Sequence, residues 1–354
     1  MFGHLPLWLL IALFVTSAAV IWFAGIQLSK NIDVLDRRLH IGNAFGGLIV
    51  LAVATNLPEI VITVTAAASG SVEVAVSNIL GGIGIQTVVI VMLDLFGKRT
   101  KDAPPLTYRA ASLTLVIEGV AVVAVLLAVV AGTQLPKSLD LFRITPEAFL
   151  IVVLWAVGLM LVRRSRAGLP WHENDAARDT KALKGQGSSA SDTSKPPASL
   201  ARAVIVFSLA AIATLAAGFV LERSGEAASS QIGLSGVLFG ATVLALATSL
   251  PEISTGLQAV KQGDVTLAFS DIFGGNAFLP VLFLVAGLVS GQAVLPSARF
   301  SDIYLTALAA LLTLVYIVGL IFRPRRRVLG MGIDSLIVLV LYLVGVAGLV
   351  GIAG

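Results

Sequence analysis

Two glutamates stand in apolar sequence, where a carboxylate is costly. Glu59 lies in the segment ATNLPEI and Glu252 in ATSLPEI. A charged side chain at the centre of a membrane helix costs roughly 2.5 to 3.5 kcal/mol even on the lenient insertion scale, so such a residue is a functional candidate by default. Cation binding is the first chemistry that these two acids suggest.

Each glutamate is accompanied by further oxygen atoms. The positions i, i+3, i+4 and i+7 share one helix face, and they hold Ala52, Thr55, Asn56 and Glu59 in the first motif and Ala245, Thr248, Ser249 and Glu252 in the second. Pro58 and Pro251 lack an N–H, which frees the backbone carbonyls one turn earlier, near Ala54 and Ala247. Such a break is tolerated in lipid only where it lines a cavity inside the protein.

Facing one another, the two motifs would offer two carboxylates with about four neutral oxygens, a set that suits a hard cation. Calcium takes six to eight oxygen ligands, whereas magnesium demands stricter octahedral geometry. Two buried carboxylates cannot both remain bare, so the site without calcium is expected to load two monovalent cations or protons. This alternation is a physical basis for exchange.

The two motifs belong to an internal duplication. Residues 47–82 align with residues 240–275 at a constant offset of 193, and about half of the aligned positions are identical. The two most polar motifs coincide in this alignment, so the chain consists of two related halves.

The composition indicates a membrane protein. Of the 354 residues, 57% are hydrophobic and only 12% are charged, and the mean hydropathy is +0.97, outside the range of soluble domains. The net charge of +4 comes from basic residues in short loops, with no basic face, so nucleic acid is not expected as a partner. The absence of cysteine excludes thiolate chemistry. The histidines lie near helix ends or in a loop and do not suggest a metal site: His4, His40 and His172.

Ten apolar runs are each long enough to cross a hydrocarbon core of about 30 Å. They cover residues 5–28, 42–68, 72–96, 107–131, 146–162, 202–221, 233–259, 264–290, 300–322 and 331–353. The first run has Lys30 after it and no basic residue before it, which favours a retained helix over a cleaved signal peptide. The predicted fold class is an all-α polytopic membrane protein with ten transmembrane helices in two inverted five-helix repeats.

The basic residues predict the orientation. The segments that follow the odd-numbered runs carry 20 of the 24 Lys and Arg residues, so the positive-inside rule places these segments in the cytoplasm and both termini outside. The helices that carry Glu59 and Glu252 then run in opposite directions, as in transporters with inverted repeats. A prokaryotic inner membrane is the expected location.

Three regions follow from this layout. Residues 1–162 form the N-terminal repeat with its motif at 47–86, and residues 202–354 form the C-terminal repeat with its motif at 240–279. Residues 163–201 are polar and rich in Ser, Gly, Pro, Lys and Asp, which predicts a disordered cytoplasmic linker.

The two motif segments resemble the alpha-repeats of the sodium/calcium exchanger family within the cation/calcium antiporters. ATNLPE and ATSLPE stand at that family's Gly-Thr-Ser-x-Pro-Glu motif. The resemblance covers both repeats and the ten-helix layout. It implies an alternating-access antiporter whose calcium ligands are Glu59, Glu252, Thr55 and Thr248, with Asn56, Ser249, Ala52 and Ala245 lining the cation sites.

The following helix of each repeat departs from the family pattern. Where the family typically reads Gly-Asn-x-x-Gly-Ser-Asn-x-x-Asn or Asp, this chain has SNILGGIGIQ at 77–86 and SDIFGGNAFL at 270–279. Gly82 and Gly275 replace hydroxyls that resemble sodium ligands, Gln86 stands for the terminal Asn, and Leu279 stands for an acidic or amide residue. We therefore expect fewer sodium ions per cycle, or protons in their place.

Four polar residues of these helices are candidates for the ion pathway or for a surrounding shell, namely Asn78, Gln86, Asp271 and Asn276. Asp271 lies about 12 Å along its helix from Leu279, too far to replace the missing ligand directly. Glu118, another acid within an apolar run, is either a proton-sensitive group or a packed, protonated structural one.

The predicted function is secondary antiport of Ca2+ against Na+, with exchange of Ca2+ or another divalent cation against H+ as the alternative. An intramembrane enzyme and a channel are remote alternatives. Gly-x-Gly-Asp and His-Glu-x-x-His motifs are absent, and an acid and a base normally need unlike environments, so no enzyme is expected. A channel would conduct without a counter-ion. No cofactor and no obligatory protein partner is expected beyond the lipid bilayer and the transported cations.

Overall fold

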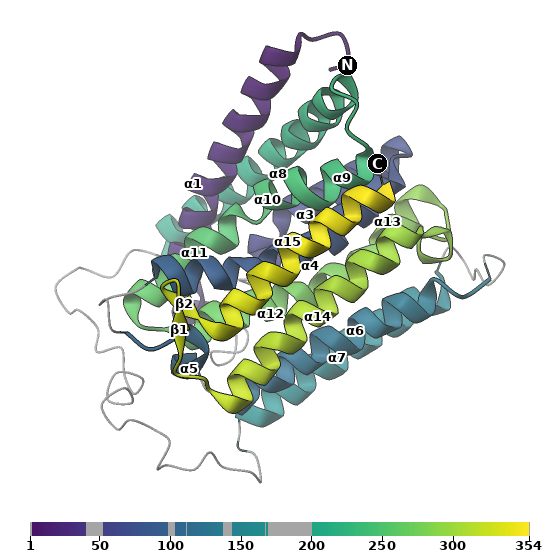
Figure 1. The fold of residues 1–354 in the computed structure, drawn as a ribbon. Coiled ribbons are helices and arrows are strands. Elements are labelled where there is room, and N and C mark those ends of the chain that lie inside the picture. Colours follow the sequence, from purple (N-terminus) through teal and green to yellow (C-terminus); the bar gives the residue numbers. More distant parts are fainter. Residues whose placement is uncertain are drawn as a thin grey trace.

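The computed structural model describes residues 2–39, 52–97, 103–110, 112–136, 144–166, 168 and 200–353. Helices make up nearly all of this part of the chain (Figure 1). They are α1 (Leu7–Leu39), α3 (Leu57–Ser69), α4 (Val72–Phe96), α5 (Leu106–Ala110), α6 (Leu113–Gly132), α7 (Pro146–Arg166), α8 (Leu200–Gln231), α9 (Gly236–Leu238), α10 (Ala245–Thr248), α11 (Leu250–Gln262), α12 (Val265–Phe278), α13 (Leu282–Ser290), α14 (Phe300–Phe322) and α15 (Ile333–Ala353). A π-helical stretch, Phe239–Leu244, joins α9 to α10, and the two-residue strands β1 (Arg327–Val328) and β2 (Met331–Gly332) form a hairpin before α15.

The all-α polytopic prediction is confirmed. In the described residues, eight helices are long and apolar enough to cross a membrane, or nine when the bent pair Gly236–Thr248 and Leu250–Gln262 is counted as one span. The apolar helix Leu57–Ser69 is shorter, and residues 42–51 of the second predicted run lie outside the described part of the chain. The exact count of ten therefore stays a prediction.

Several predicted boundaries were wrong because polar residues continue the helices beyond their apolar cores. Helix α1 extends to Leu39 and α8 to Gln231, each well past the predicted end. Helix α7 extends to Arg166, which keeps its last arginines on the helix. The run predicted over 107–131 is divided, since α5 ends at Ala110 and α6 begins at Leu113.

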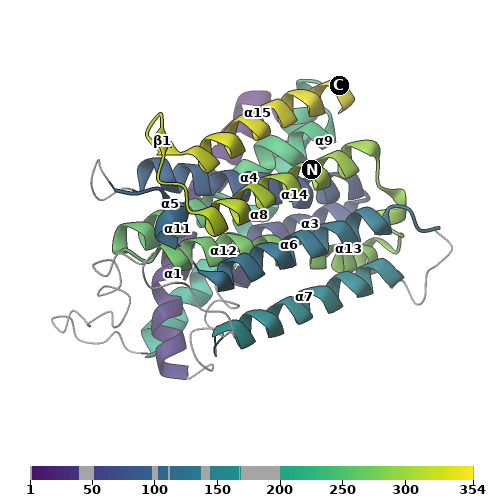
Figure 2. The ribbon, with the colours of Figure 1, turned by 60° about the horizontal axis from the view of Figure 1, so that its bottom comes forward.

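Helix α4 forms the centre of the bundle. In its most apolar window 78% of the residues are buried, compared with 28% in α1, α7 and α8. Figures 1 and 2 show α4 among the other helices, and its main neighbours are α3, α14, α15, α11 and the π-helical stretch. Burial on every side explains why α4 is apolar all round and why its few polar side chains, such as Asn78 and Gln86, are fully enclosed.

Two glycines bring the halves together in a reciprocal way. A Cβ atom on Gly25 of α1 would lie 2.9 Å from both Cα and Cβ of Pro251 in α11. A Cβ atom on Gly218 of α8 would lie 3.5 Å from Cα of Pro58 in α3. Gly25 and Gly218 are separated by the same 193 residues as the two prolines. The first helix of each half thus contacts the proline of the other half, as in an interface between two copies related by a twofold axis.

Gly25→Ala is expected to destabilise the protein, whereas Gly218→Ala is not. The new methyl group at position 25 must displace the backbone of Pro251, and overpacking of this kind costs about 1–3 kcal/mol. At position 218 it meets only ordinary van der Waals contacts. Both changes bring the same gain in helix propensity, so their difference isolates the contact. Thermal unfolding of the purified variants measures it, and equal midpoints would contradict the expectation.

Candidate functional site

The two motif prolines lie at helix starts, directly after a break. Asn56 precedes α3 with φ −86° and ψ 14°, and Ser249 precedes α11 with φ −78° and ψ 3°. The axis bends by 40° between the helix pair Gly236–Thr248 and Leu250–Gln262. The predicted break at Pro251 is confirmed, and the matching dihedral angles show that the first motif breaks in the same way.

One backbone carbonyl in each motif collects the polar side chains that follow it. The carbonyl of Ala52 accepts from the Thr55 hydroxyl at 3.2 Å and from the Asn56 amide at 2.6 Å. In the second motif, Ala245 O accepts from the hydroxyls of Thr248 and Ser249 at 3.1 and 2.8 Å. The two motifs therefore present the same compact group of oxygens, which the i, i+3, i+4 spacing predicts.

The two glutamates share one enclosed space. Glu59 and Glu252 are both completely buried. The Nε2 atom of Gln86 lies 3.5 Å from Oε1 of Glu59, 3.4 Å from Oε1 of Glu252 and 3.2 Å from Oδ1 of Asn56. A single amide group on α4 thus reaches both acids and an amide oxygen of the first motif.

The threonines connect the motifs crosswise. The Thr248 hydroxyl interacts with Glu59, and the Thr55 hydroxyl interacts with Glu252. The second carboxylate oxygen of each glutamate has no hydrogen-bond partner. None of the ion pairs in the described part of the chain involves either acid. The site is therefore a group of oxygen ligands without a basic residue of its own to neutralise it.

The glycines that depart from the family pattern have unequal neighbours. A Cβ atom on Gly275 would lie 2.9 Å from Nδ2 of Asn56 and 3.4 Å from Oε1 of Gln86. At the equivalent place in the other half, a Cβ atom on Gly82 would lie 3.6 Å from Cδ1 of Leu279. Gly275 of the C-terminal half thus faces amide groups of the N-terminal half, whereas Gly82 of the N-terminal half faces an alkyl group of the C-terminal half.

The remaining candidates lie outside this group of oxygens, with one link to it. Asp271 accepts from the Thr255 hydroxyl at 2.7 Å and also interacts with Thr55, which connects it to the site. Asn276 donates to the Thr87 hydroxyl at 3.1 Å. Asn78 is buried with both side-chain polar atoms unpaired. In the described residues no group of three or more His, Cys, Asp or Glu side chains is placed to hold a metal, so any cation here depends on two carboxylates and neutral oxygens.

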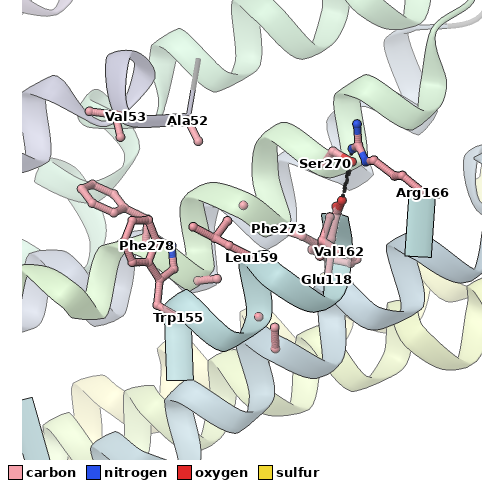
Figure 3. A pocket seen from close by; sticks show the side chains of 14 residues that line it. Ala52, Val53, Glu118, Trp155, Leu159, Val162, Arg166, Ser270, Phe273 and Phe278 are labelled. Carbon is pink, nitrogen blue, oxygen red and sulfur yellow. Dashed lines mark hydrogen bonds and ion pairs between the residues drawn. The ribbon is translucent and has the colours of Figure 1, made fainter. Parts of the chain in front are cut away.

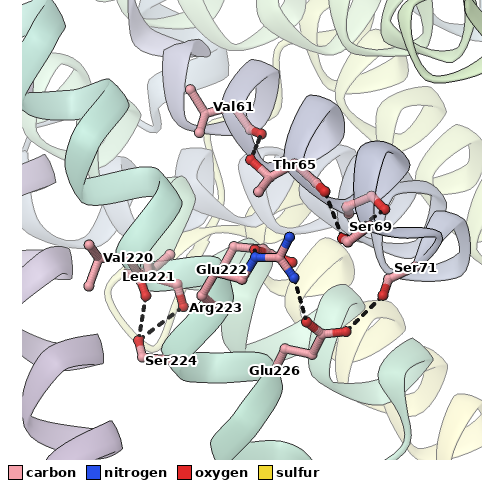
Figure 4. A network of polar contacts seen from close by, with 11 residues as sticks. Val61, Thr65, Ser69, Ser71, Val220, Leu221, Glu222, Arg223, Ser224 and Glu226 are labelled. Atoms are coloured by element: carbon pink, nitrogen blue, oxygen red, sulfur yellow. Dashed lines mark hydrogen bonds and ion pairs between the residues drawn. The ribbon is translucent and has the colours of Figure 1, made fainter. Parts of the chain in front are cut away.

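Sequence reasoning missed Glu222, because the predicted run ended at residue 221. The glutamate is fully buried on α8, and its Oε2 atom lies 3.3 Å from Nε of Arg223. Nη1 of Arg223 also lies 3.5 Å from Oε2 of Glu226, and Glu226 accepts from the Ser71 hydroxyl at 2.8 Å. Figure 4 shows this network. Ser71 directly precedes α4, so this network ties α8 to the start of the central helix. The signal in the sequence is Arg223, which directly follows Glu222 at the end of the predicted apolar run and would have extended the predicted helix.

Two known proteins have sequences similar to this chain over most of its length. The chain is 26% identical to "Putative antiporter CaxA" of Alkalimonas amylolytica over 310 residues, which cover 87% of this chain and 89% of the relative. It is 24% identical to the inner membrane protein YrbG of Escherichia coli (strain K12) over 293 residues, covering 82% and 83% of the two chains.

Two kinds of solved exchanger share the fold. The sodium-calcium exchanger NCX_Mj, soaked with Na+ and Sr2+, superposes with a TM-score of 0.62 at 15% identity, covering 97% of this chain and 99% of that one. The H+/Ca2+ exchanger CAX superposes with a TM-score of 0.63 at 14% identity, covering 98% and 89%. The family described as "Sodium/calcium exchanger protein" matches residues 9–164 and 201–351, which include both halves and both glutamate motifs. The chain is therefore a multi-pass membrane protein of the sodium/calcium exchanger family, a family of cation/calcium antiporters.

Proposed function

We propose that this chain moves Ca2+ across the membrane in exchange for Na+ by alternating access. The observation that carries the proposal is the position of the Gln86 amide within reach of both Glu59 and Glu252 in a fully buried space. Two carboxylates that share one enclosure balance the charge of one calcium ion. The carbonyls of Ala52 and Ala245 and the neighbouring threonine hydroxyls supply neutral oxygens of the kind that calcium and sodium ions bind.

The same pair of acids limits the stoichiometry. Without calcium, two buried carboxylates require two positive charges or two protons, because an unpaired buried charge is strongly unfavourable. Exchange of one Ca2+ for two monovalent cations then moves no net charge. This deepens the expectation of fewer coupling ions than a full set of family ligands would hold.

Protons are the second candidate for the coupling ion, and one contact favours them. Where the family pattern has a hydroxyl and an acidic or amide residue, Gly82 here faces the alkyl side chain of Leu279. An alkyl group offers no oxygen to a sodium ion, whereas a proton needs only the carboxylate that it neutralises. Exchange of Ca2+ or another divalent cation for H+ fits this half of the site.

We propose the inverted ten-helix layout, with both termini outside and the linker in the cytoplasm of a prokaryote. The reciprocal contacts of Gly25 with Pro251 and of Gly218 with Pro58 support two related halves of opposite sense. The excess of Lys and Arg in the segments after the odd-numbered runs supports the orientation. The cations are cargo in this proposal, so it requires no cofactor and no catalytic step.

Glu59→Gln and Glu252→Gln are each expected to abolish calcium uptake. Each change removes one of the two charges that balance Ca2+ without altering the size of the side chain. Uptake of radioactive calcium into proteoliposomes with imposed sodium or pH gradients measures the effect. Glu73→Gln is the matched control, since Glu73 is a partly exposed acid paired with Arg299. Uptake that survives in both site variants would refute the site.

Calcium exchange is expected to generate no current when the membrane voltage is clamped. The reason is that one divalent cation and two monovalent cations carry the same charge, which in each case balances the two carboxylates. Simultaneous recording of current and calcium flux in voltage-clamped proteoliposomes tests this. A sodium-dependent current that scales with calcium flux would contradict it, and flux without any counter-ion would indicate a channel.

Gln86→Leu is expected to weaken calcium affinity at least about tenfold, because a hydrogen bond to a charged group contributes about 1.5–3 kcal/mol. The change introduces into α4 the residue type that the other half has at the equivalent position, which is Leu279, directly after α12. Leu279→Met serves as the control, since it keeps the volume and the apolar character. Calorimetric titration of the purified variants with calcium measures both, and equal affinities would show that the amide takes no part.

A further inference from the structure

A cavity lies between α6, α7 and α12, and Ala52 of the first motif is among the residues that line it (Figure 3). Its volume is about 60 Å³, and a water molecule requires roughly 10–15 Å³ by this measure, so several waters fit. Ala52 and Val53 lie at one end, and Glu118, Ser270 and Arg166 lie at the other.

The first end of the cavity adjoins the oxygens of the site. Ala52 supplies the carbonyl that Thr55 and Asn56 contact. Gly274 precedes Gly275, which lies against Asn56, and a Cβ atom on Gly274 would be 3.8 Å from that of Ala52. At this end, Ala52 of the first motif therefore forms part of the cavity wall beside Gly274.

The middle of the cavity is apolar. Its walls include Trp155 and Leu159 of α7 and Phe273 and Phe278 of α12. The rings of Trp155 and Phe278 lie 5.7 Å apart between their centroids. Such walls hold no ion, so a cation in this cavity would find binding groups only at its two ends.

The second end of the cavity contains a carboxylate that can accept further contacts. Oε1 of Glu118 accepts from the Ser270 hydroxyl at 3.0 Å and lies 3.6 Å from Nη2 of Arg166. Oε2 of Glu118 is buried without a partner. From α14, which also packs against α6, the neighbour of Gly119 is the apolar Ile317. In the described residues, Arg166 is thus the one charged group paired with Glu118.

The ion pair is loose and close to the surface. Strong pairs between an arginine and a carboxylate have N–O distances of about 2.7–2.9 Å, shorter than the 3.6 Å observed here. Arg166 is the last residue of α7 and is 27% exposed, while Glu118 is only 7% exposed. The guanidinium therefore lies on the more exposed side of the buried acid, at the end of α7 from which the chain continues into the predicted linker.

We propose that Glu118 and Ser270 form a second cation-binding station, where Arg166 occupies the carboxylate until a transported cation displaces it. A carboxylate oxygen and a hydroxyl are ligands for hard monovalent and divalent cations. The proposal rests on the proposed transport function, because a cation must travel between the face where α7 ends and the two motif glutamates. Arg166 is then a tethered substitute for the ion, and Glu118 has a role in access.

The test compares calcium uptake from the two faces of oriented proteoliposomes. The chain has no cysteine, so Ser188→Cys in the linker sequence and an impermeant thiol reagent report orientation. Glu118→Gln is expected to raise KM for calcium about tenfold on the linker face, the factor that corresponds to losing one contact with a charged group, and to leave KM on the other face unchanged. Arg166→Gln is expected to lower KM on the linker face, because the competing cation is gone, and Arg166→Lys is expected to resemble wild type.

Two controls separate this role from a structural one. Glu147→Gln removes another buried acid, at the opposite end of α7, and is expected to leave both KM values unchanged. Equilibrium calcium binding to Glu118→Gln, measured by calorimetry, is expected to match wild type at the central site. Equal changes on both faces, or no change in Glu118→Gln, would overturn the station. Wild-type protein that exchanges no calcium in any gradient would instead refute the proposed function.

Discussion

The structure depends on one electrostatic constraint, which is that two carboxylates occupy a space from which water is excluded. Glu59 and Glu252 are fully buried, and each retains an oxygen without a partner. In such surroundings an uncompensated charge is far more costly than in water. The neutral donors and acceptors around the pair lower this cost, but they supply no charge. In the proposed function this charge comes from the bound cations or protons, so ion loading would stabilise the protein as well as serve transport.

The backbone meets this constraint by repeating one local device. A proline after a short break starts a new helix, and the residues before it turn their hydroxyl or amide groups toward a single carbonyl. The device works only if the neighbouring helix can come close. Gly25 permits that approach against Pro251, while Gly218 lies in ordinary contact with Pro58 at the matching place of the other half. The geometry of the motifs and the packing of the two halves thus meet at the same two prolines, Pro58 and Pro251.

Much of this arrangement could be predicted from the sequence, because the duplication supplies two observations of each motif position. The offset of 193 residues identifies the matching glutamates, and the helical spacing identifies their companions. What could not be predicted are contacts that cross between helices. Nothing in the spacing of α4 indicates that Gln86 reaches both acids, since its partners lie 27 and 166 residues away.

The ends of the helices also could not be predicted from hydropathy. Arg166 continues α7 and lies beside Glu118, so a side chain that looked unpaired within its own run has a neighbour from another. The buried Glu222 was missed for the same reason, because α8 continues for ten residues beyond its apolar part. A long charged side chain at a helix end can lie along apolar surface, so hydropathy alone misplaces such ends.

The unequal neighbours of Gly82 and Gly275 have a consequence for which conformation the protein adopts in the absence of ion gradients. In an exchanger whose halves trade places during the cycle, identical halves would make the two end states equal in energy. In the proposed alternating-access cycle, the alkyl group on one side and the amide on the other would make the two conformations differ in free energy even when both solutions are the same. Without ion gradients, the conformation with the site open to one particular side of the membrane would then be the more populated one. The ion gradients alone would still determine the direction of calcium flow.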